Sequence, residues 1–419
     1  MKKPWLIIGA VILVAAIVAA GVLLGQNGAL QKTVDELTAK VEALEAEIAE
    51  AKVAAEEAEA KAVAAMTGTI KIGGLAPLTG DVAQYGIAVR EGVDLYIKQL
   101  NDKGGINGNE VEMIWEDERG DVTEAVNAYN KLVEQDNVSA IIGDVTSKPS
   151  LAVGDLAVEI GIPIITASST AFDVTFEKPN YFRSCFLDPF QASIMANFAR
   201  DEFGATKLAV IYDNGDDYSL GLAESFKEQA EANGQEVVAY EAGAAGNVDF
   251  KAQLTNIAAK DPEVLYVAFY YTEAALIVTQ AAEVGLDVKF LGADGINGIE
   301  NVITDVALLD NAFFYSDHFA SDATSEAVLA FNADFAAMHG KAPYSAFNAT
   351  GYDAALVLCE AIAAAGSTDF AAVVEAMKNT NTQGVTGTLT FDENNNPIKS
   401  AFIMTFADGK QTFCKQQDP

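Results

Sequence analysis

The sequence predicts an α/β protein with two doubly wound lobes of parallel sheet, preceded by an N-terminal transmembrane helix and a coiled-coil helix. Half of the 419 residues are hydrophobic, which is enough to build a large core. From about residue 70 onward, short apolar runs alternate with segments of helical periodicity, and the series starts again near residue 207. This alternation is typical of parallel sheets that helices cover on both faces.

The first segment has the composition of a membrane anchor. Lys2 and Lys3 precede an uncharged apolar run over residues 5–24. At 1.5 Å per residue this run spans about 30 Å, the thickness of a bilayer core, and the lysines favour the cytoplasmic side. We expect residues 1–25 to be a transmembrane anchor, and the alternative is a signal peptide cleaved before Gly21. In both cases the rest of the chain is extracytoplasmic, either held at the outer face of the cell membrane or periplasmic or secreted.

Residues 26–66 carry a heptad pattern. Apolar residues alternate at spacings of four and three, with Glu, Lys and Ala between them. This pattern predicts a coiled-coil stalk that self-associates. A single solvated helix is the alternative, because the second half of the seam is alanine only and buries little area. The seam consists of Leu30, Val34, Leu37, Val41, Leu44, Ile48, Ala51, Ala55, Ala58, Ala62 and Ala65.

The elements expected after residue 67 follow from the hydrophobic periodicity and the turn residues between runs. The first set is a strand at 70–75, a helix at 86–101, a strand at 111–115, a helix at 124–135, a strand at 140–143, a helix at 149–160 and a strand at 163–167. The second set is a strand at 207–212, a helix at 219–233, a strand at 236–240, a helix at 250–259, a strand at 264–269, a helix at 273–284 and a strand at 290–292. Ligands of such sheets bind at the carboxyl ends of the strands.

Polar residues follow three of these strands. Ser147 comes after the strand at 140–143, where we expect it to cap the next helix, and Ser168 and Thr170 follow the strand at 163–167. A helix N-terminus attracts anions, so these groups could hold one carboxylate. In the second set, Asp294 follows a strand and could pair with an ammonium group. Ordinary capping and turn residues are the alternative for all four.

The composition excludes several classes of function. Acidic residues outnumber basic ones by 60 to 26, a net charge of −34, which is unfavourable for binding nucleic acid. His318 and His339, the only histidines, leave little room for a histidine metal site or for acid–base catalysis. Cys185, Cys359 and Cys414 lack the spacing of a zinc site or of a disulfide framework. Since GxSxG, P-loop and HExxH motifs are also missing, we expect neither an enzyme nor a bound cofactor.

Several stretches, in order and spacing, resemble a known family. They include IKIGGLAPLTGDVAQYG, IIGDVTSKPS, IPIITASSTAFDVT and FLGADG. Over residues 70–416 the chain resembles the leucine/isoleucine/valine-type periplasmic solute-binding proteins of ABC importers, which have the type I periplasmic-binding fold. The resemblance implies two lobes joined by three crossovers, with the ligand between them. Lobe one would comprise residues 67–188 and 319–398, and lobe two residues 189–318 and 399–419.

The resemblance also implies the site residues. The amino-acid carboxylate would be held at the two Ser/Thr-rich strand ends, the ammonium by an acidic residue, and the side chain by an aromatic wall. At the acidic position this chain has Asp where known members have Glu. These positions fall on Ser147, Ser168 and Thr170 for the carboxylate, Asp294 for the ammonium, and Tyr85, Tyr218, Tyr270 and Phe347 for the wall.

The function implied is that of an extracytoplasmic solute-binding protein. It would capture an amino acid, with branched-chain amino acids as the first candidates, between two closing lobes and deliver it to an ABC permease in the membrane. Two alternatives remain open from the sequence: a membrane-tethered sensor subunit built on the same fold, and a binder of amides or other small carboxylates.

Overall fold

The computed structural model describes residues 32, 38–40, 68–244, 246–321 and 325–418. The chain divides into two units, Met1–Ala65 and Met66–Pro419. The expected anchor lies outside the described residues, as does nearly all of the expected stalk. The stalk residues that are described, 32 and 38–40, are helical and exposed. The anchor and the self-association of the stalk therefore stay predictions.

The first sheet of the second unit is parallel throughout. Its strand order is β2-β1-β3-β4-β5. Strand β1 pairs with β2 on one side and with β3 on the other. Ile72 is in register with Met113 of β2 and with Ala140 of β3. The strands are β1 (Ile70–Ala76), β2 (Val111–Asp117), β3 (Ala140–Ile142), β4 (Ile164–Thr166) and β5 (Tyr181–Arg183).

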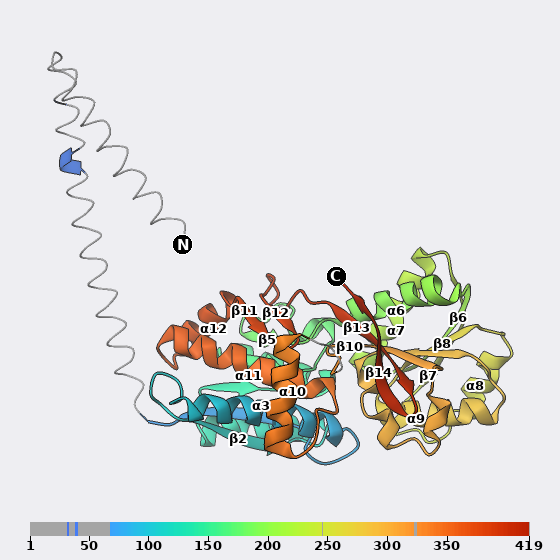
Figure 1. Cartoon of the computed structure of the whole chain (residues 1–419), viewed down its shortest axis with the longest axis horizontal. Coiled ribbons are helices and arrows are strands. Elements are labelled where there is room, and N and C mark those ends of the chain that lie inside the picture. The colour runs from blue at the N-terminus through green and yellow to red at the C-terminus, as the bar shows by residue number, and fades with distance from the viewer. Residues whose placement is uncertain (1–31, 33–37, 41–67, 245, 322–324, 419) are drawn as a thin grey trace. The chain divides into compact units, whose positions relative to one another are not determined.

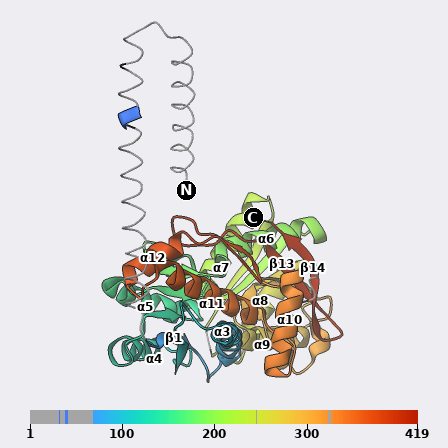
Figure 2. The ribbon, with the colours of Figure 1, turned by 60° about the vertical axis from the view of Figure 1, so that its left-hand side comes forward.

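Helices from both ends of the unit cover this sheet. They are α3 (Ala83–Asp102), α4 (Val122–Asn130), α5 (Ser147–Ile160), α10 (Glu326–His339), α11 (Ala346–Ala365) and α12 (Phe370–Lys378), with short helices η1 (Lys131–Gln135) and η2 (Phe172–Val174) and the hairpin of β11 (Thr382–Gly384) and β12 (Gly387–Leu389). Helices α3 and α11 lie side by side (Figure 1, Figure 2). Their close approach requires glycine, because a Cβ at Gly92 would lie 1.9 Å from the carbonyl oxygen of Asn348. We call this sheet with its helices lobe one.

The second sheet is mixed. Its order is β14-β13-β10-β9-β8-β6-β7. Strands β6 to β9 are parallel as expected, and β10, which the sequence analysis did not predict, pairs with β9 in the same direction. The C-terminal hairpin adds two antiparallel strands, which the sequence analysis did not predict. Asp408 and Gly409, both at positive φ, form the tight turn that reverses the chain. The strands are β6 (Lys207–Asp213), β7 (Glu236–Gly243), β8 (Val264–Ala268), β9 (Lys289–Gly292), β10 (Phe313–Asp317), β13 (Ala401–Ala407) and β14 (Lys410–Gln417).

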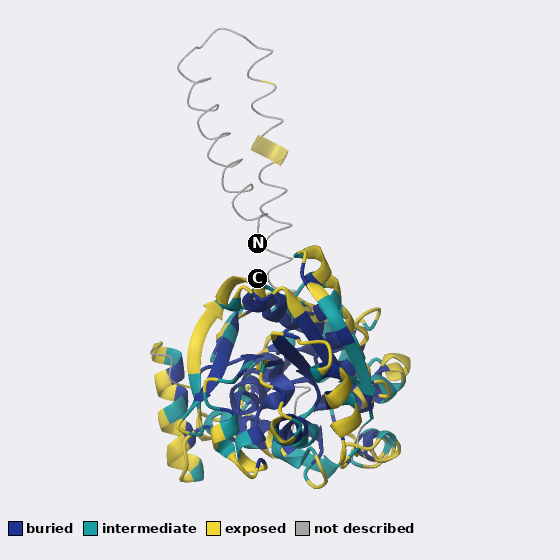
Figure 3. Cartoon of the chain, turned by 90° about the vertical axis from the view of Figure 1, so that its right-hand side faces the viewer, coloured by how far each residue is buried: buried dark blue, intermediate teal, exposed yellow. Residues whose placement is uncertain are grey.

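The second sheet and its helices form lobe two. In Figure 3 its inner strands are mostly buried, and exposed residues lie on the outer faces of the helices and on the edge strand β14. The helices are α6 (Asp188–Phe203), α7 (Asp217–Ala232), α8 (Lys251–Ala258) and α9 (Tyr271–Glu283), with short helices η3 (Asp294–Ile296), η4 (Ile299–Asn301) and η5 (Val306–Leu308).

The chain passes between the two lobes three times. It leaves lobe one after β5, returns after β10, and crosses again between β12 and β13 (Figure 1). This is the α/β architecture of two doubly wound lobes that the resemblance implied.

Most helices begin or end within three residues of their expected bounds, and one of them also changes type along its length. The helix expected over 124–135 ends at Asn130 and continues as the wider turn η1 (Lys131–Gln135). It also begins earlier, at Val122, because the Asp121 carboxylate accepts hydrogen bonds from the backbone of Thr123 and Glu124 and so caps the helix there.

Within the described ranges, no single helix has both the length and the apolar composition needed to cross a membrane. Together α11 and α12 reach that length and composition, but they bend by 116° at the break between them. Most of α11 is buried in the core of lobe one.

Candidate functional site

A cavity lies where strand ends of the two lobes face each other. The space between its lining atoms amounts to about 230 Å³, part of which is open to solvent. Seven of the eight residues singled out from the sequence line it, and Thr170 does not, although it is fully buried. The lining residues are Tyr85, Val145, Thr146, Ser147, Ser168, Tyr218, Tyr270, Asp294, Gly295 and Phe347.

Ser147 has a different local role from the one expected. The capping position of α5 is held by Thr146, and Ser147 is the first helical residue. The Ser147 hydroxyl accepts a hydrogen bond from the backbone N–H of Ala171 (3.2 Å) and so joins the loop after β4 to the start of α5. The expectation that Ser147 caps the helix was therefore wrong. Since Pro149 has no N–H and the N–H of Ser150 donates to the Thr146 carbonyl oxygen, the first-turn donors without an acceptor among the described residues are the backbone N–H groups of Ser147 and Lys148.

The loop after β4 offers further backbone groups. The Ser168 hydroxyl donates to the carbonyl oxygen of Val145 (2.7 Å), which ties this loop to the one after β3. In the described part of the chain, the backbone N–H of Thr170 finds no acceptor. Buried N–H groups are nearly always paired in proteins, so this donor points to a partner outside the chain.

Asp294 is buried and already has three partners. Its Oδ1 accepts hydrogen bonds from Gln191 Nε2 and from the Tyr218 hydroxyl, both at 3.0 Å. Its Oδ2 lies 3.0 Å from His318 Nε2. Since a carboxylate offers about four acceptor positions, roughly one remains for a ligand in the cavity.

Sequence reasoning missed Gln191 and His318. The histidine had been considered only as a candidate metal ligand or catalyst. Burial lowers the pKa of His318, although the neighbouring Asp294 acts in the opposite direction. We therefore describe the contact between these two residues as a hydrogen bond from a neutral imidazole rather than as an ion pair. The residue directly follows β10, a strand that was not predicted, so the strand-end rule could not select it.

Two more buried carboxyl groups lie near Asp294. Burial raises the pKa of Asp188 well above its ordinary value, and the nearby Asp294 raises it further. Burial and the same neighbour raise the pKa of Asp317 as well. Both groups are therefore harder to ionise than an ordinary aspartate.

The remaining wall is aromatic. The rings of Tyr218 and Tyr270 are stacked, with centroids 4.8 Å apart. The Tyr85 ring meets Phe347 edge to face at 5.1 Å and Tyr270 at 5.7 Å. Such rings present apolar faces to a ligand while their edges and hydroxyls bind polar groups.

Hydrogen bonds across the cleft show that the lobes are closed. The Tyr85 hydroxyl of lobe one donates to the carbonyl oxygen of Gly295 in lobe two (2.5 Å). Lys148 Nζ donates to the carbonyl oxygen of Gly215 (2.8 Å). The Tyr271 hydroxyl donates to the carbonyl oxygen of Asp81 (2.6 Å).

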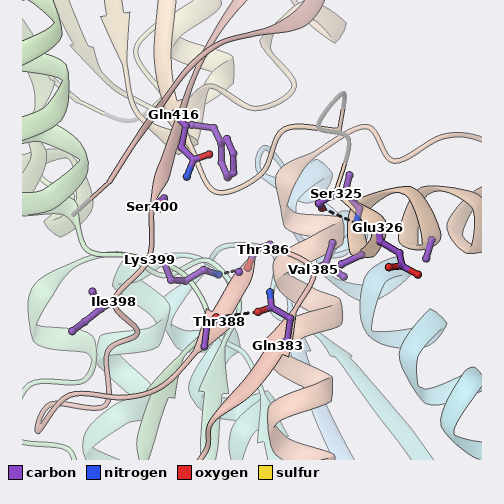
Figure 4. A pocket seen from close by; sticks show the side chains of 15 residues that line it. Ser325, Glu326, Gln383, Val385, Thr386, Thr388, Ile398, Lys399, Ser400 and Gln416 are labelled. Carbon is purple, nitrogen blue, oxygen red and sulfur yellow. Dashed lines mark hydrogen bonds between the residues drawn. The ribbon is translucent and has the colours of Figure 1, made fainter.

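A larger, open groove lies between the start of α10, the β11–β12 hairpin and β13 (Figure 4). Lys399 is buried in its wall, and its ammonium group donates to the carbonyl oxygen of Ser184 (2.8 Å) and to the Thr386 hydroxyl. Among its lining residues, all of which are described, no buried side-chain nitrogen or oxygen lacks a partner. The groove therefore carries no polar group that needs a ligand, and the smaller cavity is the candidate site.

The described residues contain no group of three or more His, Cys, Asp or Glu side chains that could hold a metal ion. Cys185 and Cys359 are buried, Cys414 is exposed, and all three are free thiols.

Comparison with known proteins agrees with this architecture. The model of a family described as periplasmic binding protein matches residues 69–411. The Leu/Ile/Val-binding protein homolog 3 of Brucella melitensis biotype 1 is 32% identical over 347 residues, which cover 81% of this chain and 92% of that protein. The leucine-, isoleucine-, valine-, threonine- and alanine-binding protein of Pseudomonas aeruginosa is 31% identical, with 78% and 86% covered.

A solved structure is similar over the same region. It is the branched-chain amino acid transporter substrate-binding protein LivJ of Streptococcus pneumoniae, in complex with isoleucine. Its TM-score is 0.79 at 32% identity, and the match covers 84% of this chain and 100% of that one. The chain therefore belongs to the periplasmic binding protein family, whose members are substrate-binding proteins of transporters and not enzymes, as the resemblance in its sequence implied.

Proposed function

We propose that this chain is an extracytoplasmic substrate-binding protein that captures a branched-chain amino acid between its lobes and delivers it to an ABC permease. The names of its relatives support the ligand class, since they bind leucine, isoleucine and valine, and the LivJ structure holds isoleucine. The geometry of the cavity supports it independently.

The cavity is complementary to a zwitterion, and this is the observation that carries the proposal. At one side are the first-turn N–H groups of α5 and the unpaired N–H of Thr170, which suit a carboxylate. At the other side is the buried carboxylate of Asp294, with an acceptor position left for an ammonium group. The Ser168 carbonyl oxygen, which accepts no hydrogen bond from the described residues, is a second acceptor for that ammonium.

The rest of the lining favours an apolar side chain. Asp294 is the only charged residue among the ten that line the cavity. The aromatic rings would cover the ligand's hydrocarbon part and exclude water from both charged ends. Because Asp294 would pair with the ligand's ammonium group, a basic or acidic side chain would find no further partner of opposite charge there.

Closure gives the protein a shape that a permease can recognise. A ligand that contacts both lobes favours the closed state by the difference in its affinity for the two states. The N-terminal segment would then act as a single-pass anchor that keeps the lobes at the extracytoplasmic face, and the heptad seam would pair anchored copies.

Calorimetric titration tests this proposal. The full-length chain should be unfolded and refolded first, because ligand can remain bound through purification. Leucine, isoleucine and valine should bind with micromolar or tighter affinity, and charged amino acids should bind much more weakly. Binding of neutral amides or carboxylates without an ammonium group, with no binding of amino acids, would overturn the proposed ligand class.

A further inference from the structure

Arg183, at the end of β5, binds the loop after β4 and is completely buried. Its Nη1 donates to the carbonyl oxygen of Ser169 (3.0 Å). Its Nη2 donates to the carbonyl oxygen of Ala171 and to the hydroxyl of Thr175, both at 2.9 Å. The guanidinium thus holds the segment that contains Thr170.

This buried cation has no ion-pair partner. No carboxylate oxygen of the described residues lies within 4.0 Å of Arg183, and its Nε makes no hydrogen bond. Asp188 and Asp392 act on it only over longer distances, and burial makes Asp188 harder to ionise by raising its pKa. An uncompensated buried charge is costly, so its presence points to an anion that completes the site.

The other buried cation, Lys399, shows the contrast. Its ammonium group contacts the Thr386 hydroxyl, which in turn donates to Asp353. Asp353 is fully buried in lobe one, so this cation has a carboxylate one hydroxyl away. In the described part of the chain, Arg183 has no such relay.

The peptide bond between Ser169 and Thr170 connects Arg183 to the proposed carboxylate position. Its carbonyl group accepts from Arg183, and because the bond is trans, the N–H of Thr170 points the opposite way. That N–H is the unpaired donor described above. The next residue, Ala171, donates to Ser147, which lines the cavity, so the segment lies beside the site. A cation at the carbonyl end polarises the peptide and strengthens the donor at the other end.

We propose that Arg183 is a positioning residue that selects ligands bearing a carboxylate, by directing and polarising the N–H of Thr170 toward that group. The inference rests on the proposed function. Arg183 does not touch the ligand; its charge acts through one peptide bond. It therefore affects ligands with a carboxylate more than neutral analogues of the same shape.

The test compares leucine with leucinamide, in which a neutral amide replaces the carboxylate. Calorimetry on the refolded full-length chain at about pH 6 keeps the ammonium on both ligands. In Arg183→Gln, leucine affinity should fall on the order of 10- to 100-fold while leucinamide affinity changes less than about threefold. Arg183→Lys, which keeps the charge but loses the fork, should weaken binding and still prefer leucine.

A control separates this effect from a merely structural one. Thr175→Val removes one acceptor of the guanidinium without changing charge, so it should affect both ligands equally. Equal losses for leucine and leucinamide in Arg183→Gln would overturn the proposal. If Arg183→Gln does not fold, Arg183→Lys is the deciding variant. Loss of its preference for leucine over leucinamide would overturn the proposal. If the wild-type chain binds neither ligand, the proposed function fails, and this assignment fails with it.

Discussion

The two ends of the candidate site are built from different chemical groups. The lobe one end consists of backbone N–H groups in two loops, held from behind by the buried side chains of Arg183 and Ser147. The lobe two end consists of one carboxylate, Asp294, held by the side chains of Gln191, Tyr218 and His318. A side-chain substitution other than one to proline leaves a backbone donor in place, whereas any substitution of Asp294 except one to Glu removes its carboxylate. We therefore expect the lobe two end to be far more sensitive to mutation.

The largest expected effect is that of Asp294→Ala. It leaves the ligand's ammonium buried without its charged partner, which should cost about 2–5 kcal/mol of binding free energy. Titration calorimetry with leucine measures this directly. Asp287→Ala is a matched control in the same lobe, because Asp287 is exposed, and it should leave the affinity unchanged. An unchanged affinity in Asp294→Ala would break the comparison by removing the lobe two end from the site.

Behind the lobe one end lies a pair of buried carboxyl groups. Glu118 follows β2, and Asp144 precedes the loop that begins α5; both are completely buried. Glu118 Oε1 and Asp144 Oδ2 each lack a hydrogen-bond partner of ordinary geometry, and the two groups are close enough to interact. Burial raises the pKa of Glu118 to about 7 and that of Asp144 well above its ordinary value. The pair keeps a proton that the unfolded chain would lose.

This pair predicts a fall in stability with rising pH. Between pH 4.5 and about 7 the folded state binds more protons than the unfolded state, so the free energy of unfolding decreases as pH rises. The stabilisation is complete below pH 4.5 and is lost as pH rises through about 7, a change on the order of 3 kcal/mol. In Glu118→Gln, chemical denaturation at pH 5 and pH 8 should show most of this difference removed. Glu112 is exposed on β2, the strand that Glu118 follows, and Glu112→Gln should keep this pH-dependent difference in stability.

Each lobe contains elements that the sequence predicted and elements that it did not, the latter including α10, α11 and α12 of lobe one and α6 and β10 of lobe two. Strands and helices of both sets were predicted because their periodicity is local, and the strand-end rule selected Ser147, Ser168 and Asp294. The antiparallel hairpin of β13 and β14 was missed, since its pairing to β10 joins segments about 90 residues apart.

The supporting residues could not be predicted for the same reason. Gln191 and Asp294 are separated by 103 residues, and Ser147 bonds to a loop 24 residues away. Local spacing contains no information on such contacts. The capping role expected for Ser147 was wrong because a tertiary hydrogen bond competes for its hydroxyl. The strand-end rule and the family resemblance identified the groups that line the cavity better than those that hold them in place.

A smaller effect is expected at the contact between the ends. Tyr85→Phe removes the hydroxyl that donates to Gly295 and accepts from the backbone N–H of Tyr271 at 3.3 Å, so the closed state loses one short and one long hydrogen bond, together worth about 1 kcal/mol. Leucine affinity should fall roughly fivefold, and small-angle scattering without ligand should show a more open protein. Tyr96→Phe on the same helix is the control, because its ring packs against Tyr352 within lobe one. Equal behaviour of both variants would show that Tyr85 does not hold the lobes together.

The smallest effect at neutral pH is expected for His318→Gln, and it sharpens the comparison most. Glutamine can also donate to Asp294, so leucine affinity at pH 7 should change less than about threefold.

At acid pH, wild type and His318→Gln should differ in stability and in leucine affinity. Burial lowers the pKa of His318 below its ordinary 6.5, so the unfolded chain takes up a proton first and stability falls as pH drops below 6.5. A protonated imidazole would also compete with the ligand's ammonium for Asp294. His318→Gln should therefore keep both stability and leucine affinity better than wild type near pH 5, measured by denaturation and calorimetry. The two lobes would then limit the stability of the protein at opposite ends of the pH range. Lobe one would do so through Glu118 as pH rises, and lobe two through His318 as pH falls. Equal acid sensitivity of wild type and His318→Gln would remove that opposition and leave the net charge of −34 as the main source of the pH dependence.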